Sequence, residues 1–207
     1  MRSRRHPALL AVLLAATLAG CATTGGPPPA AGPGTPVSGS VPATTVTTPA
    51  TPGGFSGTDT AWLQLTIAMD ERIIQVFDLL SDRVGDPELR ALVSRFETAH
   101  RDTLRRLRAL HDRSGGPTTN PHEGHDMPGM ATQAQLAAVR RATGRTAADL
   151  FAELTRAHLD QSVRLARAER EHGVEPATRT VAAEIERTRA DQRAELDRLL
   201  PTEDAAG

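Results

Sequence analysis

The sequence predicts an all-α fold: an antiparallel four-helix bundle made from two similar helical hairpins, plus a short connecting helix. Apolar residues recur at spacings of three and four from Asp59 onward, which is the pattern of amphipathic helices. Glycine and proline divide this region into four long helical stretches. The two halves of the region also match each other at a single offset. Two hairpins with one apolar face each can bury those faces together as a bundle.

The first hairpin is defined by two apolar stripes and the turn between them. The first stripe consists of Trp62, Leu65, Met69, Ile73, Val76 and Leu80. Gly85-Asp86-Pro87 follows, and predicts a glycine C-cap, an aspartate N-cap and a proline in the next first turn. The second stripe consists of Leu89, Leu92, Phe96, Leu107 and Leu110. We expect this second helix to end at Ser114-Gly115.

A shorter helix and a second hairpin follow. Residues 132–143 begin with a Thr-x-x-Gln capping-box pattern, and Gly144 breaks that helix. The third long helix carries Phe151, Leu154, His158 and Leu165 and stops at Gly173, and the fourth begins near Glu175-Pro176. An offset of 89 residues places Trp62 on Phe151, Met69 on His158 and Asp86-Pro87 on Glu175-Pro176. One offset for two helices and their turn indicates a duplication.

Composition excludes several classes of protein. A single cysteine among 207 residues rules out an internal disulfide framework and a multi-cysteine metal cluster. A formal net charge of -1, with four Phe and one Trp as the only aromatic residues, argues against nucleic-acid binding. The Arg- and Glu-rich stretch over residues 164–198 is interpreted as solvated helix faces.

The N-terminal segment predicts export and lipid attachment. Residues 1–20 have a basic start and an apolar stretch too short to span a bilayer. Leu18-Ala19-Gly20-Cys21 resembles the bacterial lipobox. In a lipobox the cysteine carries fatty acyl chains such as palmitate and becomes the mature N-terminus. Cys21 would then anchor the chain to the lipid bilayer at the extracytoplasmic face of the membrane. An ordinary signal peptide with a chance cysteine is the alternative.

The remaining boundaries follow from composition. Residues 21–58 are rich in Pro, Thr and Gly, so we expect a disordered tether. The helical bundle is expected over residues 59–200, which is enough chain for one core, and a disordered tail over 201–207.

Over residues 59–200 the chain resembles the secreted bacterial proteins of the domain of unknown function 305 group, which have a ferritin-like helical bundle. Three segments carry the resemblance: Gly85-Asp86-Pro87 with Arg90, the loop over residues 124–130, and residues 151–166 with Glu169, His172-Gly173 and Pro176. The resemblance implies His-His pairs in the first and third helices and Glu and Met in the second and fourth. For some members it also implies copper or silver binding.

The chain departs from that pattern where ligands would lie. The aligned residues are Met69-Asp70 and His158-Leu159 for the His-His pairs, Thr103 and Gln192 for the glutamates, and Leu107 and Leu196 for the methionines. A di-iron centre needs inward carboxylates from several helices, so a redox metalloenzyme is not expected. Met69 and His158, with His100 also inward, leave a remnant soft-metal site as one interpretation. Plain core packing without a metal is the other.

The loop between the hairpins is the densest group of potential ligands. His122, His125, Met127 and Met130 lie within nine residues and offer imidazole and thioether groups, which suit copper. A polar connector without function is the alternative. The leading hypothesis is therefore a non-enzymatic, membrane-anchored lipoprotein that binds or buffers copper. The alternative is an envelope structural or interaction protein with a decayed site.

Overall fold

The computed structural model describes residues 54–122 and 124–201. The described residues form five helices and no strand, which confirms the all-α prediction. The helices are α1 (Gly57–Leu80), α2 (Pro87–Ser114), α3 (Gln133–Val139), α4 (Gly144–His172) and α5 (Pro176–Leu199). None of them is long and apolar enough to cross a bilayer. Cys21 and the predicted signal peptide lie outside the described residues, as do most of the predicted tether and all of the predicted tail after Pro201.

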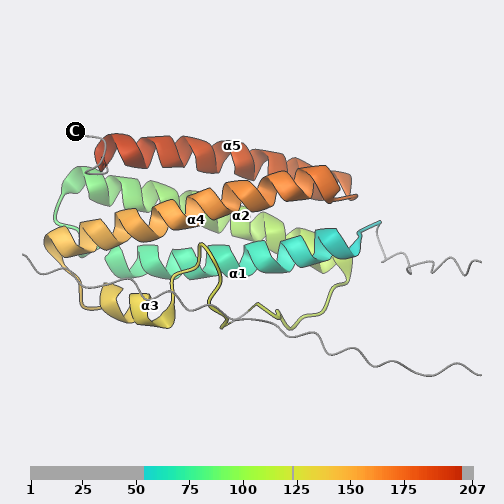
Figure 1. Ribbon diagram of the computed structural model, residues 1–207, viewed down its shortest axis with the longest axis horizontal. Coiled ribbons are helices and arrows are strands. Elements are labelled where there is room, and N and C mark those ends of the chain that lie inside the picture. The colour runs from blue at the N-terminus through green and yellow to red at the C-terminus, as the bar shows by residue number, and fades with distance from the viewer. Residues whose placement is uncertain (1–53, 123, 202–207) are drawn as a thin grey trace, which may run out of the picture. The chain divides into compact units, whose positions relative to one another are not determined.

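The four long helices form a bundle in which each helix packs against two antiparallel neighbours (Figure 1). α1 contacts α2 and α4, and α5 contacts the same two helices. Arg95 of α2 pairs with Glu195 of α5, while Arg113 at the other end of α2 pairs with Glu175. The reversed order of these partners fixes the two helices as antiparallel. The chain between α2 and α4 returns along the bundle and places α3 beside α1.

The turn of the first hairpin differs in one respect from its prediction. Asp86 is the N-cap of α2, since its carboxylate accepts from the backbone N–H groups of Glu88 and Leu89, and Pro87 is the first helical residue. The prediction of Gly85 as the C-cap of α1 was wrong, because α1 ends at Leu80. Val84 is fully buried, so the chain leaves the helix early in order to place this side chain in the core.

The folded part begins slightly before the boundary expected at Asp59. Ser56 is the N-cap of α1 and forms a capping box with Asp59. Phe55 is also buried, and the guanidinium of Arg113 lies 5.8 Å from the centre of its ring. A second capping box, Thr132 with Gln135, starts α3 as the sequence predicts.

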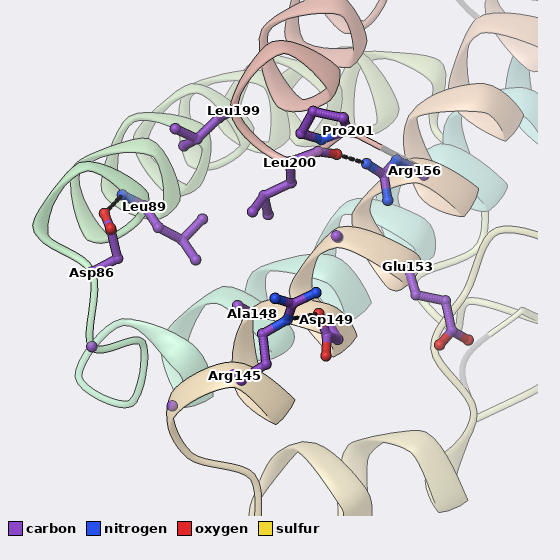
Figure 2. A pocket seen from close by; sticks show the side chains of 13 residues that line it. Asp86, Leu89, Arg145, Ala148, Asp149, Glu153, Arg156, Leu199, Leu200 and Pro201 are labelled. Carbon is purple, nitrogen blue, oxygen red and sulfur yellow. Dashed lines mark hydrogen bonds and ion pairs between the residues drawn. The ribbon is translucent and has the colours of Figure 1, made fainter. Parts of the chain in front are cut away.

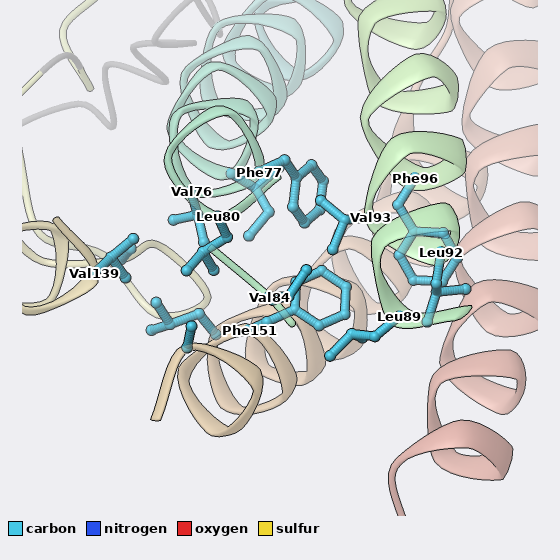
Figure 3. Close-up of a cluster of buried hydrophobic side chains, with 14 of the residues drawn as sticks. Val76, Phe77, Leu80, Val84, Leu89, Leu92, Val93, Phe96, Val139 and Phe151 are labelled. Carbon is cyan, nitrogen blue, oxygen red and sulfur yellow. The ribbon is translucent and has the colours of Figure 1, made fainter. Parts of the chain in front are cut away.

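The core consists of two apolar clusters along the bundle. The larger one gathers around Phe77, Phe96 and Phe151, whose rings lie in tilted contact (Figure 3). The other one contains Trp62, Leu63, Leu107 and Ile185. Both α1 and α2 contribute residues to each of the two clusters. Asp70 on α1 and His100 on α2 are buried near the boundary between the two clusters. Buried polar side chains therefore lie between the two apolar clusters of the bundle.

Candidate metal centre

Each long helix contributes one buried ionisable side chain to a single cluster. Asp70 comes from α1, His100 from α2, His158 from α4 and Arg189 from α5, and none of the four is more than 2% exposed. We call these four residues the polar cluster. Burying such groups is costly unless they are paired, so their mutual contacts decide what the cluster can do.

Asp70 is the centre of the polar cluster. The distance from its Oδ1 to His100 Nδ1 is 3.0 Å, and that to His158 Nε2 is 3.4 Å. Its other oxygen, Oδ2, lies 3.4 Å from Nη2 of Arg189. Arg189 in turn donates from Nη1 to Oε1 of Gln192 at 3.0 Å. One carboxylate therefore joins the other three long helices to α1.

The charges in the cluster are set by burial and by the guanidinium. Burial alone would raise the pKa of Asp70, but the charge of Arg189 and the His100 ring hold this pKa far below its usual value. Burial, followed by the charge of Arg189, lowers the pKa of His100 to about 3. Burial also lowers the pKa of His158. At neutral pH the cluster therefore contains one anion, one cation and two neutral imidazoles.

Several nitrogen atoms of the cluster have no hydrogen-bond partner. His100 Nε2, His158 Nδ1 and Arg189 Nε are buried and unpaired among the described residues. Leaving a buried polar atom unpaired costs about 1–3 kcal/mol. A neutral imidazole that donates one N–H to Asp70 keeps a lone pair on its other nitrogen. The ring nitrogens that face Asp70 are His100 Nδ1 and His158 Nε2, so an ion held together with Asp70 Oδ1 would bind these two atoms, with the N–H of each ring on its other nitrogen.

The residues predicted as a remnant site lie in the same part of the bundle. His158 belongs to the polar cluster, and Met69, which precedes Asp70, is 1% exposed. Met69 packs in a small cluster with Met130 of the loop, and Met127 covers it. Thr103, also expected inward, donates instead to the carbonyl of Ala99 in its own helix.

The loop that carries the other candidates is packed against α1 and α4. Arg72 of α1 donates to the carbonyl of Ala131 at 2.6 Å. Gly129 has a φ of +80°, and a Cβ there would lie 2.4 Å from Cβ of Gln161 on α4. The loop therefore crosses α4 one turn from His158, which brings Met130 next to Met69.

The two loop histidines are placed differently. His125 is exposed, and His122 borders a separate hollow of about 460 Å³ near the start of α1 and the end of α4. Asp70, His100 and His158 form the group of potential metal ligands found among the described residues. One ligand atom from each of these side chains lies within 4.8 Å of the other two. The structure thus joins the loop methionines, and not the loop histidines, to the predicted bundle site.

Asp70 and Arg189 are the members of the cluster that the sequence did not identify as site residues. The interpretation of residues 164–198 as solvated faces was wrong at Arg189, whose side chain is 1% exposed. The duplication offers a signal for it, since the same 89-residue offset that relates the hairpins places His100 on Arg189. Only the fold shows that Asp70 lies between them.

A second buried carboxylate pair lies where α1 begins and α4 ends. Asp59 accepts from the backbone N–H groups of Val174 and Glu175, at 2.9 and 3.1 Å. Glu169 is 1% exposed, and burial, followed by its hydrogen bond with Asp59, raises its pKa to about 8. Glu169 is therefore protonated at neutral pH, beside the ionised Asp59. The pair holds the start of α1 to the turn between α4 and α5.

Another hollow lies at the opposite end of the bundle, where α4 begins and α5 ends. It measures about 930 Å³ and combines Leu89 and Leu199 with charged side chains (Figure 2). On its wall, Arg145 pairs with Asp149, and Arg156 pairs with Asp197. None of its lining residues belongs to the polar cluster.

The fold and the cluster define an all-α bundle with a buried polar centre between its two hairpins. Residues 59–200 match the Domain of unknown function (DUF305), and the chain belongs to this family. No curated protein matches the chain.

Two solved structures have a similar fold. One, described as the "putative secreted protein DUF305" of Streptomyces coelicolor, is 18% identical, with a TM-score of 0.63 over 69% of this chain and 91% of that one. The other, a DUF305 fragment from Deinococcus radiodurans, is also 18% identical, with a TM-score of 0.64 over 70% and 97%. At this identity the likeness concerns the fold alone.

Proposed function

We propose that this protein is a non-enzymatic envelope lipoprotein that binds and buffers a soft monovalent metal, copper(I), inside its helical bundle. The observation that carries the proposal is the convergence of Asp70, His100 and His158, one from each of three helices, with ligand atoms within 4.8 Å. All three side chains are at most 2% exposed. A substrate would have no direct access to an ion held there, which favours buffering over turnover.

The spacing of the three side chains fits one small ion. Ligand atoms about 2.1 Å from a tetrahedral ion lie about 3.4 Å from one another. The two contacts to Asp70 Oδ1, at 3.0 and 3.4 Å, are close to such an edge. Metal binding requires neutral imidazole, and the lowered pKa values of His100 and His158 keep both rings neutral at physiological pH, while the N–H of each ring would have to move to the nitrogen that faces away from Asp70.

The neighbouring methionines favour a soft ion. Met69 and Met130 are buried together, and Met69 directly precedes Asp70 in α1. Thioether and imidazole groups are the ligands that copper(I) prefers over the oxygen ligands of hard cations. The bundle and the loop would then act as one site, with His122 and His125 outside it.

The anchor rests on the sequence around Cys21. The Streptomyces coelicolor neighbour, described as a secreted protein, supports an extracytoplasmic location. Labelling of cells with radioactive palmitate should mark the wild-type chain and not the Cys21→Ala variant. Equal labelling of both would contradict the anchor.

Competitive titration with copper(I) and a chromophoric chelator tests the metal site, using the chain from residue 21 onward with Cys21→Ser. His158→Leu and His100→Leu should each lower the affinity at least a hundredfold. His125→Ala is the matched control, because this imidazole is exposed, and it should leave the affinity unchanged. Loss of binding only on combined substitution of His122, His125, Met127 and Met130 would move the site to the loop.

One observation favours a second function, that of an envelope interaction protein with a decayed metal site. Arg189 already balances the charge of Asp70, so the bundle can fold without an ion. Metal analysis of the protein purified from its own host separates the two functions. Metal-free native protein, together with unchanged growth of a deletion strain under copper stress, would support the interaction protein.

A further inference from the structure

Arg189 is the unusual component of the polar cluster. It is the largest fully buried side chain among the described residues. Burial lowers its pKa, but an arginine remains charged at any physiological pH. Its guanidinium contacts Oδ2 of Asp70 and Oε1 of Gln192, at 3.4 and 3.0 Å. A permanent positive charge therefore shares a carboxylate with the two candidate metal ligands His100 and His158.

This charge changes which ions the cluster can accept. Without an added ion, the negative charge of Asp70 and the positive charge of Arg189 cancel. Each positive charge on an entering ion therefore adds a net charge to the buried cluster. At an effective dielectric constant of about 20, a unit charge about 5 Å away weakens binding more than a hundredfold for each charge on the ion. The binding affinity of a divalent ion is therefore lowered by this factor twice, and that of a monovalent ion once. Buried charges are also screened little by salt.

In the sequence offset that relates the two hairpins, Arg189 corresponds to the candidate ligand His100. The 89-residue offset places Met69 on His158 and His100 on Arg189. An imidazole at position 189 would complete a set of one carboxylate and three imidazoles, which suits zinc or cobalt. The second hairpin instead carries a cation at that place.

We propose that Arg189 is the charge-selectivity residue of this site, excluding divalent ions such as Zn²⁺ while it still admits a monovalent soft ion. Only one part of this inference, the admission of a monovalent ion, rests on the proposed copper(I) function. The exclusion of divalent ions follows from the cluster itself. Arg189 acts on the ion through its charge and through Asp70, so it is a positioning residue and not a ligand.

Two titrations test the inference, with Co²⁺ as the divalent probe and Ag⁺ as the monovalent one. Wild-type protein should give no tetrahedral Co²⁺ absorption at stoichiometric metal. Arg189→Gln, which removes the charge, should bind Co²⁺ at least a hundredfold more tightly and show that absorption. Arg189→Lys retains the charge and should behave like wild type. Arg193→Gln removes a partly exposed arginine of the same helix, which pairs with Asp160, and should also change nothing.

Stability gives a second readout, because Arg189→Gln leaves the buried Asp70 without its partner. Equimolar Co²⁺ should raise the melting temperature of this variant and leave that of wild type unchanged. Absence of both the absorption and the thermal shift would overturn the inference, as would equal Co²⁺ binding by Arg189→Lys. If wild type fails to bind Ag⁺ while Arg189→Gln gains Co²⁺, the copper function fails and the exclusion of divalent ions stands.

Discussion

The buried pair of Asp59 and Glu169 predicts that Glu169→Gln makes the protein more stable above neutral pH. The pKa of Glu169 is raised from 4.5 to about 8 by burial and by Asp59. Between these values the folded state holds a proton that the unfolded state has lost, so stability falls as pH rises through this window. The contribution of Glu169 is complete below about pH 4.5 and absent above about pH 8.

The size of the effect follows from the width of the window. At about 1.4 kcal/mol for each pH unit, the ceiling is about 5 kcal/mol. The turn at Gly173 touches the Glu169 carboxyl and can relax around a charged form, so we expect about 2–3 kcal/mol. A glutamine amide stays neutral beside Asp59 at every pH and removes this loss. Near pH 9 the variant should then melt about 5–10 °C above wild type.

Other groups titrate in the same range and must be separated from Glu169. The pKa values of His100 and His158 are lowered, so their contribution to stability is lost as pH falls below about 6.5, opposite to that of Glu169. The pKa of Asp59 is lowered to about 2: burial raises it, but the hydrogen bonds of Ser56 outweigh this, so it matters only in stronger acid. His100, His158 and Asp59 are present in both proteins. Their contributions therefore cancel when the unfolding free energy of wild type is subtracted from that of the variant.

The assay is urea unfolding of both proteins at intervals from pH 5 to pH 9. Glu171→Gln is the matched control, because this carboxylate is exposed on the same helical turn and lies 3.9 Å from His172. A difference in unfolding free energy that stays constant from pH 5 to pH 9 would show that Glu169 titrates normally, and would refute the assignment of a proton to this pair.

Three further predictions concern stability. Asp70→Asn should destabilise the domain by about 3–5 kcal/mol in urea unfolding, because it leaves Arg189 buried and unpaired. The double variant Asp70→Leu with Arg189→Met should recover most of that loss. Equal losses in the two proteins would argue against the ion pair. Gly129→Ala should lower stability by more than Gly124→Ala, since both glycines have positive φ but only Gly129 touches Gln161, and each left-handed alanine costs about 1–2 kcal/mol. Ser56→Ala should cost about 1 kcal/mol by removing the N-cap of α1. The control in the same thermal melts is Ser94→Ala, which lies exposed inside α2, removes no cap and should be slightly stabilising.

The fold could be predicted from the sequence because its signals are local. Asp86-Pro87 and Thr132 with Gln135 act within one helical turn, and the structure confirms each of them. The C-cap at Gly85 could not be predicted in this way, because the position of Val84 in the core ends α1 earlier. Local patterns fail where a distant packing contact decides the outcome.

The polar cluster was only partly predictable for the same reason. His158 is recognisable because it lies on an apolar stripe, where an imidazole is unusual. Arg189 lies among many exposed arginines and glutamates of the same helix, and nothing in its local sequence distinguishes it from them. Its burial depends on Asp70, which lies more than a hundred residues earlier and on another helix.

The duplication also explains why the cluster must be asymmetric. His100 and Arg189 both contact Asp70, so if both hairpins carried the residues of the second one, two guanidinium groups would meet in the core with a leucine in place of Asp70. Like charges at such separations in a buried site repel strongly, and neither would have a partner. The offset pairs Asp70 with Leu159 and His100 with Arg189, so one hairpin supplies the anion and the other the cation. The divergence of the two hairpins at these positions is therefore what allows an oppositely charged pair to be buried between them.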